Sequence, residues 1–374
     1  MQRMNWVVFA SGFAAVVAQT VIIREALALF GGNELVSGIL LSTWLIWAGI
    51  GSLVYSSIRF KRDPLRVYAV LLLLLCIFLF VSLCTIRIAP RIFGLPIGEV
   101  IDLGRIISIS ILTLAPVCIA FGALFPAASR ILPPERVYLI EGLGAFAGGI
   151  LVSFLLVSVL PPFGIMLISV VVLLLSVLFV KRRLGWCFLP LMLLIMFARL
   201  DSIEVFFRKI QMGSQDLVGL EESRYGMIAV TESGSQYNFY TNGLYDFSYP
   251  DVFSSEEAVH YALLLHPDPE DVLLVGGGVG NSVDQVLKHP SVKKVTYVEL
   301  DPLLFRMAET YLGENLGIRE NLNIVFGDAR YYVKRSPIYY DVIIVNLPDP
   351  VNVQINRFYT EEFFAEANRI LKPG

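Results

Sequence analysis

Six long apolar runs fill the first 180 residues and limit what this chain can fold into. Each run is long enough to cross a hydrocarbon core of about 30 Å as a helix that rises about 1.5 Å per residue. In lipid such a segment satisfies its own backbone hydrogen bonds only as a helix. We therefore predict a polytopic α-helical membrane domain at 1–200, in contact with the lipid bilayer. The runs cover residues 6–30, 35–58, 67–89, 106–128, 138–160 and 163–180.

A seventh run, 186–200, is shorter and contains Pro190, so a short span and a helix lying at the membrane interface both fit it. The predicted domain thus has six or seven helices. Basic residues follow the second, fourth and sixth runs, whereas the turns at 31–34 and 161–164 carry none. The positive-inside rule then puts the amino terminus in the cytoplasm. Six spans would return the chain to the cytoplasm, and a seventh would place the next domain outside.

Polar residues inside the apolar runs need an explanation because each is costly in lipid. Gln19, Arg24 and Glu25 end the first run, and Glu141 begins the fifth. An Arg–Glu pair that fixes helix packing is one interpretation, and a site for a polar or cationic solute between helices is the other. Small residues near Glu141 predict close helix packing; they are Gly142, Gly144, Ala145, Gly148 and Gly149.

Charge divides unevenly along the chain. Residues 1–200 hold 15 Lys and Arg against 7 Asp and Glu, a net of +8, whereas 201–374 hold 14 against 25, a net of −11. An acidic second half argues against nucleic acid as a partner, because phosphate binding needs a basic face. The four cysteines lie in apolar stretches, and the three histidines form no zinc-type spacing, so we expect no metal.

The periodicity changes after a predicted linker at 201–220. Alternating residues and turn signals predict a small β-meander and a helix at 221–265. From 266 to 374 the pattern becomes strand–helix–strand, typical of a Rossmann-like α/β domain with a class I methyltransferase-type sheet. Its strands are predicted at 272–275, 295–298, 324–326 and 342–345, and the preceding helix at Ser254–Leu265.

Glycine-rich or acidic loops follow these strands, at the edge where open α/β sheets bind ligands. The first strand runs into Gly276, Gly277, Gly278, Val279 and Gly280, where backbone N–H groups can approach a ligand without Cβ clashes. Ser282 and Gln285 have the spacing of a capping box. An acid at the tip of the second strand, Glu299, can take both hydroxyls of a ribose. With Asp328 after the third strand, this order predicts an adenosine-type cofactor.

These residues resemble the spermidine synthase (polyamine aminopropyltransferase) family over about 150 residues from Glu221 onward. The membrane half is similar to that of bacterial proteins in which such a domain follows a multi-span segment. The matching motifs are Ser223–Gly226, Asn242-Gly243, Glu256–Pro267, the glycine loop, Val298–Asp301, Gly327-Asp328-Ala329, Tyr340–Ile344, Asp349-Pro350 and Phe358–Thr360.

The resemblance implies transfer of an aminopropyl group from decarboxylated S-adenosylmethionine to a polyamine or another amine. Glu299 would hold ribose, and Asp328 with Ala329 would lie at the adenine. The candidate catalytic residues are Asp349, Asn346, His260 and Tyr359, and the candidate substrate residues are Asp246, Tyr225 and Asp349. The resemblance also implies an integral protein of a bacterial inner membrane, with the soluble domain in the cytoplasm where adenosylated cofactors are found, and it leaves a homo-oligomer open.

The substrate side departs from the family pattern. Val279 stands where the family has an Asp facing the amine tail of the cofactor. Asn346 stands where it has an Asp as base, and an amide accepts no proton at neutral pH. Asp246 replaces a Gln, and the family's Tyr-His pair is reversed as His260-Tyr261. We therefore keep two hypotheses: an aminopropyltransferase, or its neighbour an S-adenosylmethionine-dependent methyltransferase; and a non-catalytic sensor or transporter that binds a nucleotide or polyamine.

The chain ends at Leu371–Gly374, a helix-end signal after which the family continues with further strands. Only about four strands of the parallel sheet are present, which leaves an edge strand that should be central. We expect a C-terminally truncated, incomplete sheet.

Overall fold

The computed structural model describes residues 2–58, 63–180, 198–213, 215–313 and 319–373. The chain divides into two compact units, one of residues 1–96 and 101–213 and the other of residues 97–100 and 214–374. The predicted run at 186–200 lies outside the described residues except for its last three positions.

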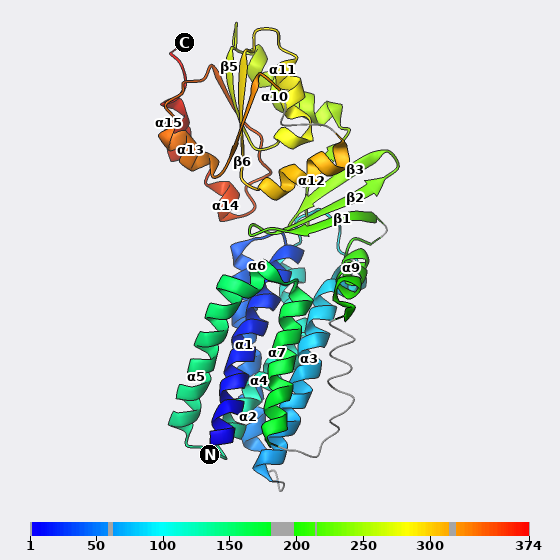
Figure 1. Cartoon of the computed structure of the whole chain (residues 1–374), viewed down its shortest axis with the longest axis vertical. Coiled ribbons are helices and arrows are strands. Elements are labelled where there is room, and N and C mark those ends of the chain that lie inside the picture. The colour runs from blue at the N-terminus through cyan, green and yellow to red at the C-terminus, as the bar shows by residue number, and fades with distance from the viewer. Residues whose placement is uncertain (1, 59–62, 181–197, 214, 314–318, 374) are drawn as a thin grey trace. The chain divides into compact units, whose positions relative to one another are not determined.

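The first unit is a helical bundle (Figure 1). Among its described residues, five helices are long and apolar enough to cross a membrane, and a sixth apolar helix is shorter. These helices confirm the predicted helical segment and indicate an integral membrane protein. The long helices are α1 (Gln2–Leu29), α2 (Glu34–Ser57), α3 (Pro64–Phe93), α4 (Leu103–Ala128) and α5 (Pro134–Leu151), the last continued by a π-turn at Val152–Leu156 and by α6 (Val157–Val159); the shorter one is α7 (Pro162–Val180).

Glycines bring pairs of these helices into backbone contact. A Cβ on Gly144 of α5 would overlap the Phe9 carbonyl of α1, and one on Gly148 would lie 2.7 Å from the Phe13 carbonyl oxygen. A Cβ on Gly142 would meet nothing within 4 Å. The predicted packing role of the small residues is therefore confirmed for Gly144 and Gly148, which face α1, whereas Gly142 faces away from it.

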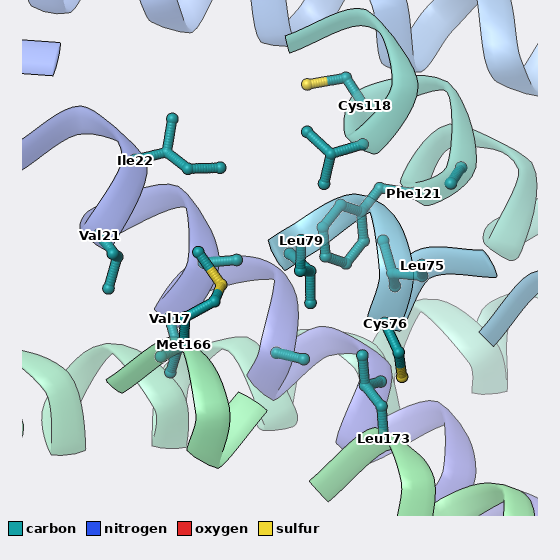
Figure 2. Close-up of a cluster of buried hydrophobic side chains, with 14 of the residues drawn as sticks. Val17, Val21, Ile22, Leu75, Cys76, Leu79, Cys118, Phe121, Met166 and Leu173 are labelled. Carbon is teal, nitrogen blue, oxygen red and sulfur yellow. The ribbon is translucent and has the colours of Figure 1, made fainter. Parts of the chain in front are cut away.

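Apolar side chains from α1, α3, α4 and α7 fill the centre of the bundle (Figure 2). Leu79 of α3 and Val17 of α1 are fully buried there, and Phe121 of α4 and Met166 of α7 pack around them. Helices that are apolar on nearly every side suit this arrangement, since one side packs in the bundle and the other meets lipid.

A buried cluster of charges links three helices of the first unit. The carboxylate of Glu25 accepts from Arg87 Nε of α3 and from Arg208 Nη2, each at 2.8 Å. Arg87 also pairs with Glu204, which together with Arg208 lies on α9 (Leu200–Gln211). Two acids and two bases therefore neutralise one another, which supports the packing interpretation of Glu25. Its partners are distant in sequence, and the adjacent Arg24 donates instead to the Val157 carbonyl oxygen at 3.4 Å.

The predicted linker at 201–220 contains α9 and the first strand of the meander, which is a correction. Residues Leu200–Gln211 are amphipathic and bury Leu200, Glu204 and Arg208 against the bundle, so they form a helix. The meander has four antiparallel strands in the order β1-β2-β3-β4. They are β1 (Asp216–Glu222), β2 (Met227–Ser233), β3 (Gln236–Thr241) and β4 (Leu244–Tyr249).

The second sheet is parallel, with the strand order β7-β6-β5-β8, and confirms the predicted α/β class (Figure 1). Helices α10, α11 and α12 pack with the meander on one face, and α13 and α15 cover the other. The strands are β5 (Asp271–Val275), β6 (Lys294–Glu299), β7 (Leu322–Phe326) and β8 (Val342–Val345). The helices are α10 (Val252–Leu264), α11 (Ser282–Leu287), α12 (Pro302–Leu312), α13 (Ala329–Arg335), α14 (Val353–Asn356) and α15 (Glu361–Asn368).

Candidate functional site

The carboxyl edge of the parallel sheet holds most of the predicted site. From β5 the chain continues to β6 and β7 on one side, whereas β8 pairs with β5 on the other side. The direction of winding reverses between β5 and β8, and ligands of open α/β sheets bind at such a switch point. The loops after β5, β6 and β8 all begin at this edge.

The glycine loop after β5 is held between neighbouring loops. Gly277 has φ +64°, a left-handed conformation that glycine adopts without strain. A Cβ on Gly278 would lie 2.6 Å from the ring of Tyr297, and one on Gly280 would lie 3.1 Å from the ring of Phe247 in β4. Side chains at these positions would push the loop away from its supports, so the loop requires glycine there.

Glu299 ends β6 with its carboxylate buried. Its Oε1 accepts the backbone N–H of Asp301 at 2.9 Å, and its Oε2 accepts the hydroxyl of Tyr297. Burial, helped by the negative charges of Asp246 and Asp301, raises the pKa of Glu299 to about 7, although the two hydrogen bonds lower it. The group is therefore a hydrogen-bond acceptor close to its own titration point at neutral pH.

Tyr297 lies between the glycine loop and Glu299. Its ring is buried beside Gly278, and its hydroxyl donates to the Glu299 carboxylate. Burial, then the charge of Glu299, raises the pKa of Tyr297 well above its usual value, against a backbone hydrogen bond from Val279. Tyr297 therefore contacts both the glycine loop and the Glu299 carboxylate, and the predicted convergence of the loop amides and this carboxylate on one ligand stays a prediction.

Asp328 has its two oxygens engaged. One accepts the N–H groups of Arg330 and Tyr331 and caps α13, and the other pairs with Arg357 at 2.6 Å. Ala329 is buried at the first position of that helix. An adenine bound at Asp328, as predicted, would therefore either displace the guanidinium of Arg357 from this carboxylate or bind beside it.

The loop after β8 lies against the glycines. The Asn346 side chain lies so close to Gly277 that a Cβ there would overlap it, and its Nδ2 donates to Ser282 Oγ at 3.0 Å. The predicted capping box at Ser282 is wrong, because Ser282 is already the first residue of α11. The residue at the N-cap position is Asn281, which has φ +81° and whose side chain makes no capping hydrogen bond. Asn346 thus acts as a structural tie, and an amide in this place cannot act as a base.

Asp349 and Tyr359 lie together on the same side of that loop. The Tyr359 hydroxyl donates to the backbone oxygens of Leu347 at 3.0 Å and Pro348 at 3.2 Å. Burial and then the charge of Asp349 raise the pKa of Tyr359. Asp349 itself is exposed, so its carboxylate is accessible to an amine.

The meander contributes Asp246 and Tyr225 differently. Asp246 of β4 is half-buried and accepts Thr241 Oγ1 at 3.0 Å; burial raises its pKa, against that hydrogen bond. Its charge also raises the pKa of Tyr297, and the ring of the next residue, Phe247, packs against Gly280 of the glycine loop. Tyr225 instead lies in the turn before β2, where its carbonyl accepts Asn242 Nδ2 at 3.3 Å.

His260, a candidate catalytic residue from the sequence, lies beside a second histidine. Its Nδ1 lies 2.8 Å from Nε2 of His289, which follows α11. Burial and then His260 lower the pKa of His289. The structure pairs two imidazoles here, and the catalytic role of His260 stays a prediction.

Sequence reasoning missed Tyr297, Ser282 and Arg357 as parts of this site. For Tyr297 a signal was present, because it stands two residues before Glu299 on one strand and shares its face. A buried tyrosine also needs a partner for its hydroxyl. For Ser282 and Arg357 no local sequence pattern predicts the partner, because their partners, Asn346 and Asp328, are distant in sequence and only the fold brings them close.

Comparison with known proteins relates the C-terminal part of this chain to one family. Residues 252–374 match the family model described as "Spermine/spermidine synthase domain". A polyamine aminopropyltransferase of Oceanobacillus iheyensis is 34% identical over 168 residues, which are 42% of this chain and 32% of that protein. Polyamine aminopropyltransferase 1 of Bacillus cereus is 36% identical over 155 residues, 41% of this chain and 55% of the relative.

Among solved structures, one described as spermidine synthase in complex with the transition state analogue AdoDATO is 31% identical, with a TM-score of 0.39. The match covers 42% of this chain and 55% of that one. This chain therefore spans between a third and just over half of the length of these relatives.

Proposed function

Because the C-terminal half of this chain belongs to the spermidine synthase family, we propose that it binds an S-adenosylmethionine-type nucleoside and transfers a group from it to an amine. The decarboxylated form, with aminopropyl transfer to a polyamine, is the proposed reaction. A membrane-tethered transferase follows, since the same chain carries five long apolar helices. We place the transferase domain on the cytoplasmic side of a bacterial inner membrane, where such nucleosides are available.

One observation carries the proposal: at the carboxyl edge of the sheet, Tyr297 packs against the glycine loop and donates its hydroxyl to the Glu299 carboxylate. Each carboxylate oxygen has two lone pairs, and Tyr297 and the Asp301 amide use one on each. Glu299 therefore keeps acceptor capacity for the two hydroxyls of a ribose. The buried surroundings strengthen such hydrogen bonds.

The residues of the chain fit the rest of the ligand in part. Asp328, held at the start of α13, would receive the adenine amino group beside Arg357. Asp349, exposed near Tyr359, would bind an ammonium group of the acceptor amine and align a neutral nitrogen for attack. When bound, the nucleoside supplies an electrophilic carbon next to a sulfonium, and the protein supplies orientation and negative charge.

Calorimetry on the detergent-solubilised chain tests the proposal. We expect binding of S-adenosylmethionine or its decarboxylated form, weakened roughly tenfold to a hundredfold in Glu299→Gln because a hydrogen bond to a charged acceptor is lost. Asp268→Asn, an exposed acid in another loop, is the matched control and should bind as the unaltered chain does. No binding of either nucleoside would refute the proposal.

Turnover separates aminopropyl transfer from its neighbours. Polyamines are incubated with each nucleoside, and aminopropylated or methylated amine is measured by mass spectrometry. Product formed only with the decarboxylated form supports aminopropyl transfer. If the chain does not bind the decarboxylated form, or binds it no better than S-adenosylmethionine, aminopropyl transfer is refuted. Product with S-adenosylmethionine assigns a methyltransferase.

A non-catalytic sensor or transporter is favoured by one observation, the amide of Asn346 tied to Ser282 in place of a base. The discriminating variant is Asn346→Asp. If this change creates turnover in a chain that had none, the native domain binds without reacting. If Asp349→Ala abolishes an existing turnover, the enzyme assignment holds.

A further inference from the structure

Asp246 occupies the irregular position of the β3–β4 ladder. Phe239 pairs with Phe247 and Tyr240 pairs with Tyr245, so Asp246 has no residue opposite it. This is a β-bulge, which bends a strand and redirects the side chain of the extra residue. Bulges occur often beside functional sites for that reason.

The bulge lies against the glycine loop. The ring of Phe247, next along the chain, stacks on Phe239 at 4.4 Å between centroids and lies under Gly280. The carboxylate of Asp246 is held by Thr241 Oγ1 at 3.0 Å. Asp246 is therefore a fixed group of the meander that borders the site, and its position does not depend on a flexible loop.

No basic side chain neutralises this part of the site within the described residues. Asp246 accepts from a threonine hydroxyl, and Glu299 accepts from a tyrosine hydroxyl and a backbone amide. Asp301, after β6, accepts the N–H of Leu303 as a helix cap. The negative charge of Asp246 raises the pKa of Glu299, and two such acids with only neutral donors favour a proton or a cation beside them.

We propose that Asp246 makes the site select a nucleoside with a fixed positive charge, such as a sulfonium, over its neutral thioether. The inference rests on the proposed function and identifies Asp246 as the residue that distinguishes a charged ligand from a neutral one. Asp246 attracts the cation through space, while Glu299 holds the neutral ribose that both nucleosides share. We expect a preference of about tenfold, the lower end for a charged interaction, because Asp246 is half-buried.

The experiment compares S-adenosylmethionine with S-adenosylhomocysteine, which differ by one methyl group and one charge. Affinities are measured by calorimetry on the full detergent-solubilised chain, for the unaltered protein, Asp246→Asn and the control Asp268→Asn. The asparagine keeps the size of the side chain and an acceptor for Thr241. We expect the tenfold preference in the unaltered chain and in the control, and equal binding of the two nucleosides in Asp246→Asn.

The outcomes separate this inference from the proposed function. Equal binding of both nucleosides by the unaltered chain overturns the inference and leaves nucleoside binding intact. The inference is also overturned if Asp246→Asn keeps the preference for S-adenosylmethionine. This outcome counts when the circular dichroism spectrum of the variant and its affinity for S-adenosylhomocysteine match those of the unaltered chain. Binding of neither nucleoside by the unaltered chain overturns both. Loss of the preference with retained affinity for the thioether supports the inference.

Discussion

Replacing Glu25 by Gln should destabilise the helical bundle strongly, because its carboxylate is the shared acceptor of two buried guanidinium groups. Glu25 binds Arg87 through hydrogen bonds of 2.8 and 3.1 Å and Arg208 through one of 2.8 Å. Both arginine side chains are essentially inaccessible to solvent. Without the negative charge, Glu204 is the remaining acid for two positive charges.

The expected loss is about 3 kcal/mol, the lower end for breaking a buried ion pair, since the Gln oxygen still accepts one hydrogen bond. In a unit of this size 1 kcal/mol corresponds to roughly 2–4 °C, which gives about 6–12 °C in the midpoint of thermal unfolding. The assay measures the temperature at which half of the detergent-solubilised chain has unfolded, followed by the circular dichroism signal of its helices.

The control is Arg105→Gln, which removes an exposed ion pair with Asp102 and leaves the helix cap in place. It should cost about 0–1 kcal/mol. A double variant, Glu25→Gln with Arg208→Gln, should be less destabilised than the sum of its single changes, because charge balance is restored. If Glu25→Gln lowers the midpoint no more than Arg105→Gln does, the buried cluster does not hold the bundle together.

Three further changes test other parts of the chain. Gly144→Ala should lower the bundle's unfolding midpoint by several degrees because its Cβ would overlap the backbone of α1, whereas Gly142→Ala, with open space, should not. Burial raises the pKa of Asp341, but hydrogen bonds from the Asp271 amide and Lys372 lower it overall. The contribution of Asp341 to stability should therefore be present at neutral pH and be lost as the pH falls through that lowered pKa. Asp341→Asn should remove this pH dependence in a series of denaturation measurements. Because burial raises the pKa of Glu299 to about 7, nucleoside affinity should fall as pH drops below 7, and Glu299→Gln should flatten that profile in calorimetry.

The sequence predicted the elements whose pattern is local. Apolar runs identified the bundle helices, and four apolar strands ending in glycine or acid identified the parallel sheet and its ligand edge. Strand β1 was missed because Asp216–Glu222 contains a glycine and three acids, and its pairing with β2 overrides weak strand propensity. Helix α9 was missed although its apolar residues have helical spacing, because the segment between the two predicted domains was interpreted as a linker.

Partners across the fold were not predictable from the sequence. The sequence predicted an Arg–Glu pair without identifying the partner of Glu25, and its two guanidinium partners lie 62 and 183 residues away. The site shows the same limit: Glu299 was placed correctly at a strand end, but the hydroxyl of Tyr297 on its carboxylate follows from burial of that side chain. Spacing fixes which face a residue lies on, whereas packing decides which atoms meet.

The acids at the carboxyl edge differ in how the fold neutralises them, and this difference decides where a cation can bind. Asp328 has Arg357 as its counter-ion, and Asp349 is exposed, where water and salt screen its charge. In the described part of the site, Glu299 is buried and Asp246 is half-buried, and both accept hydrogen bonds from neutral donors alone. Attraction for a positive ligand is strongest where charge is least screened and least paired. A count of acids in and around the sheet edge would rank the four alike, whereas the identity of their hydrogen-bond donors separates Glu299 and Asp246 from the other two.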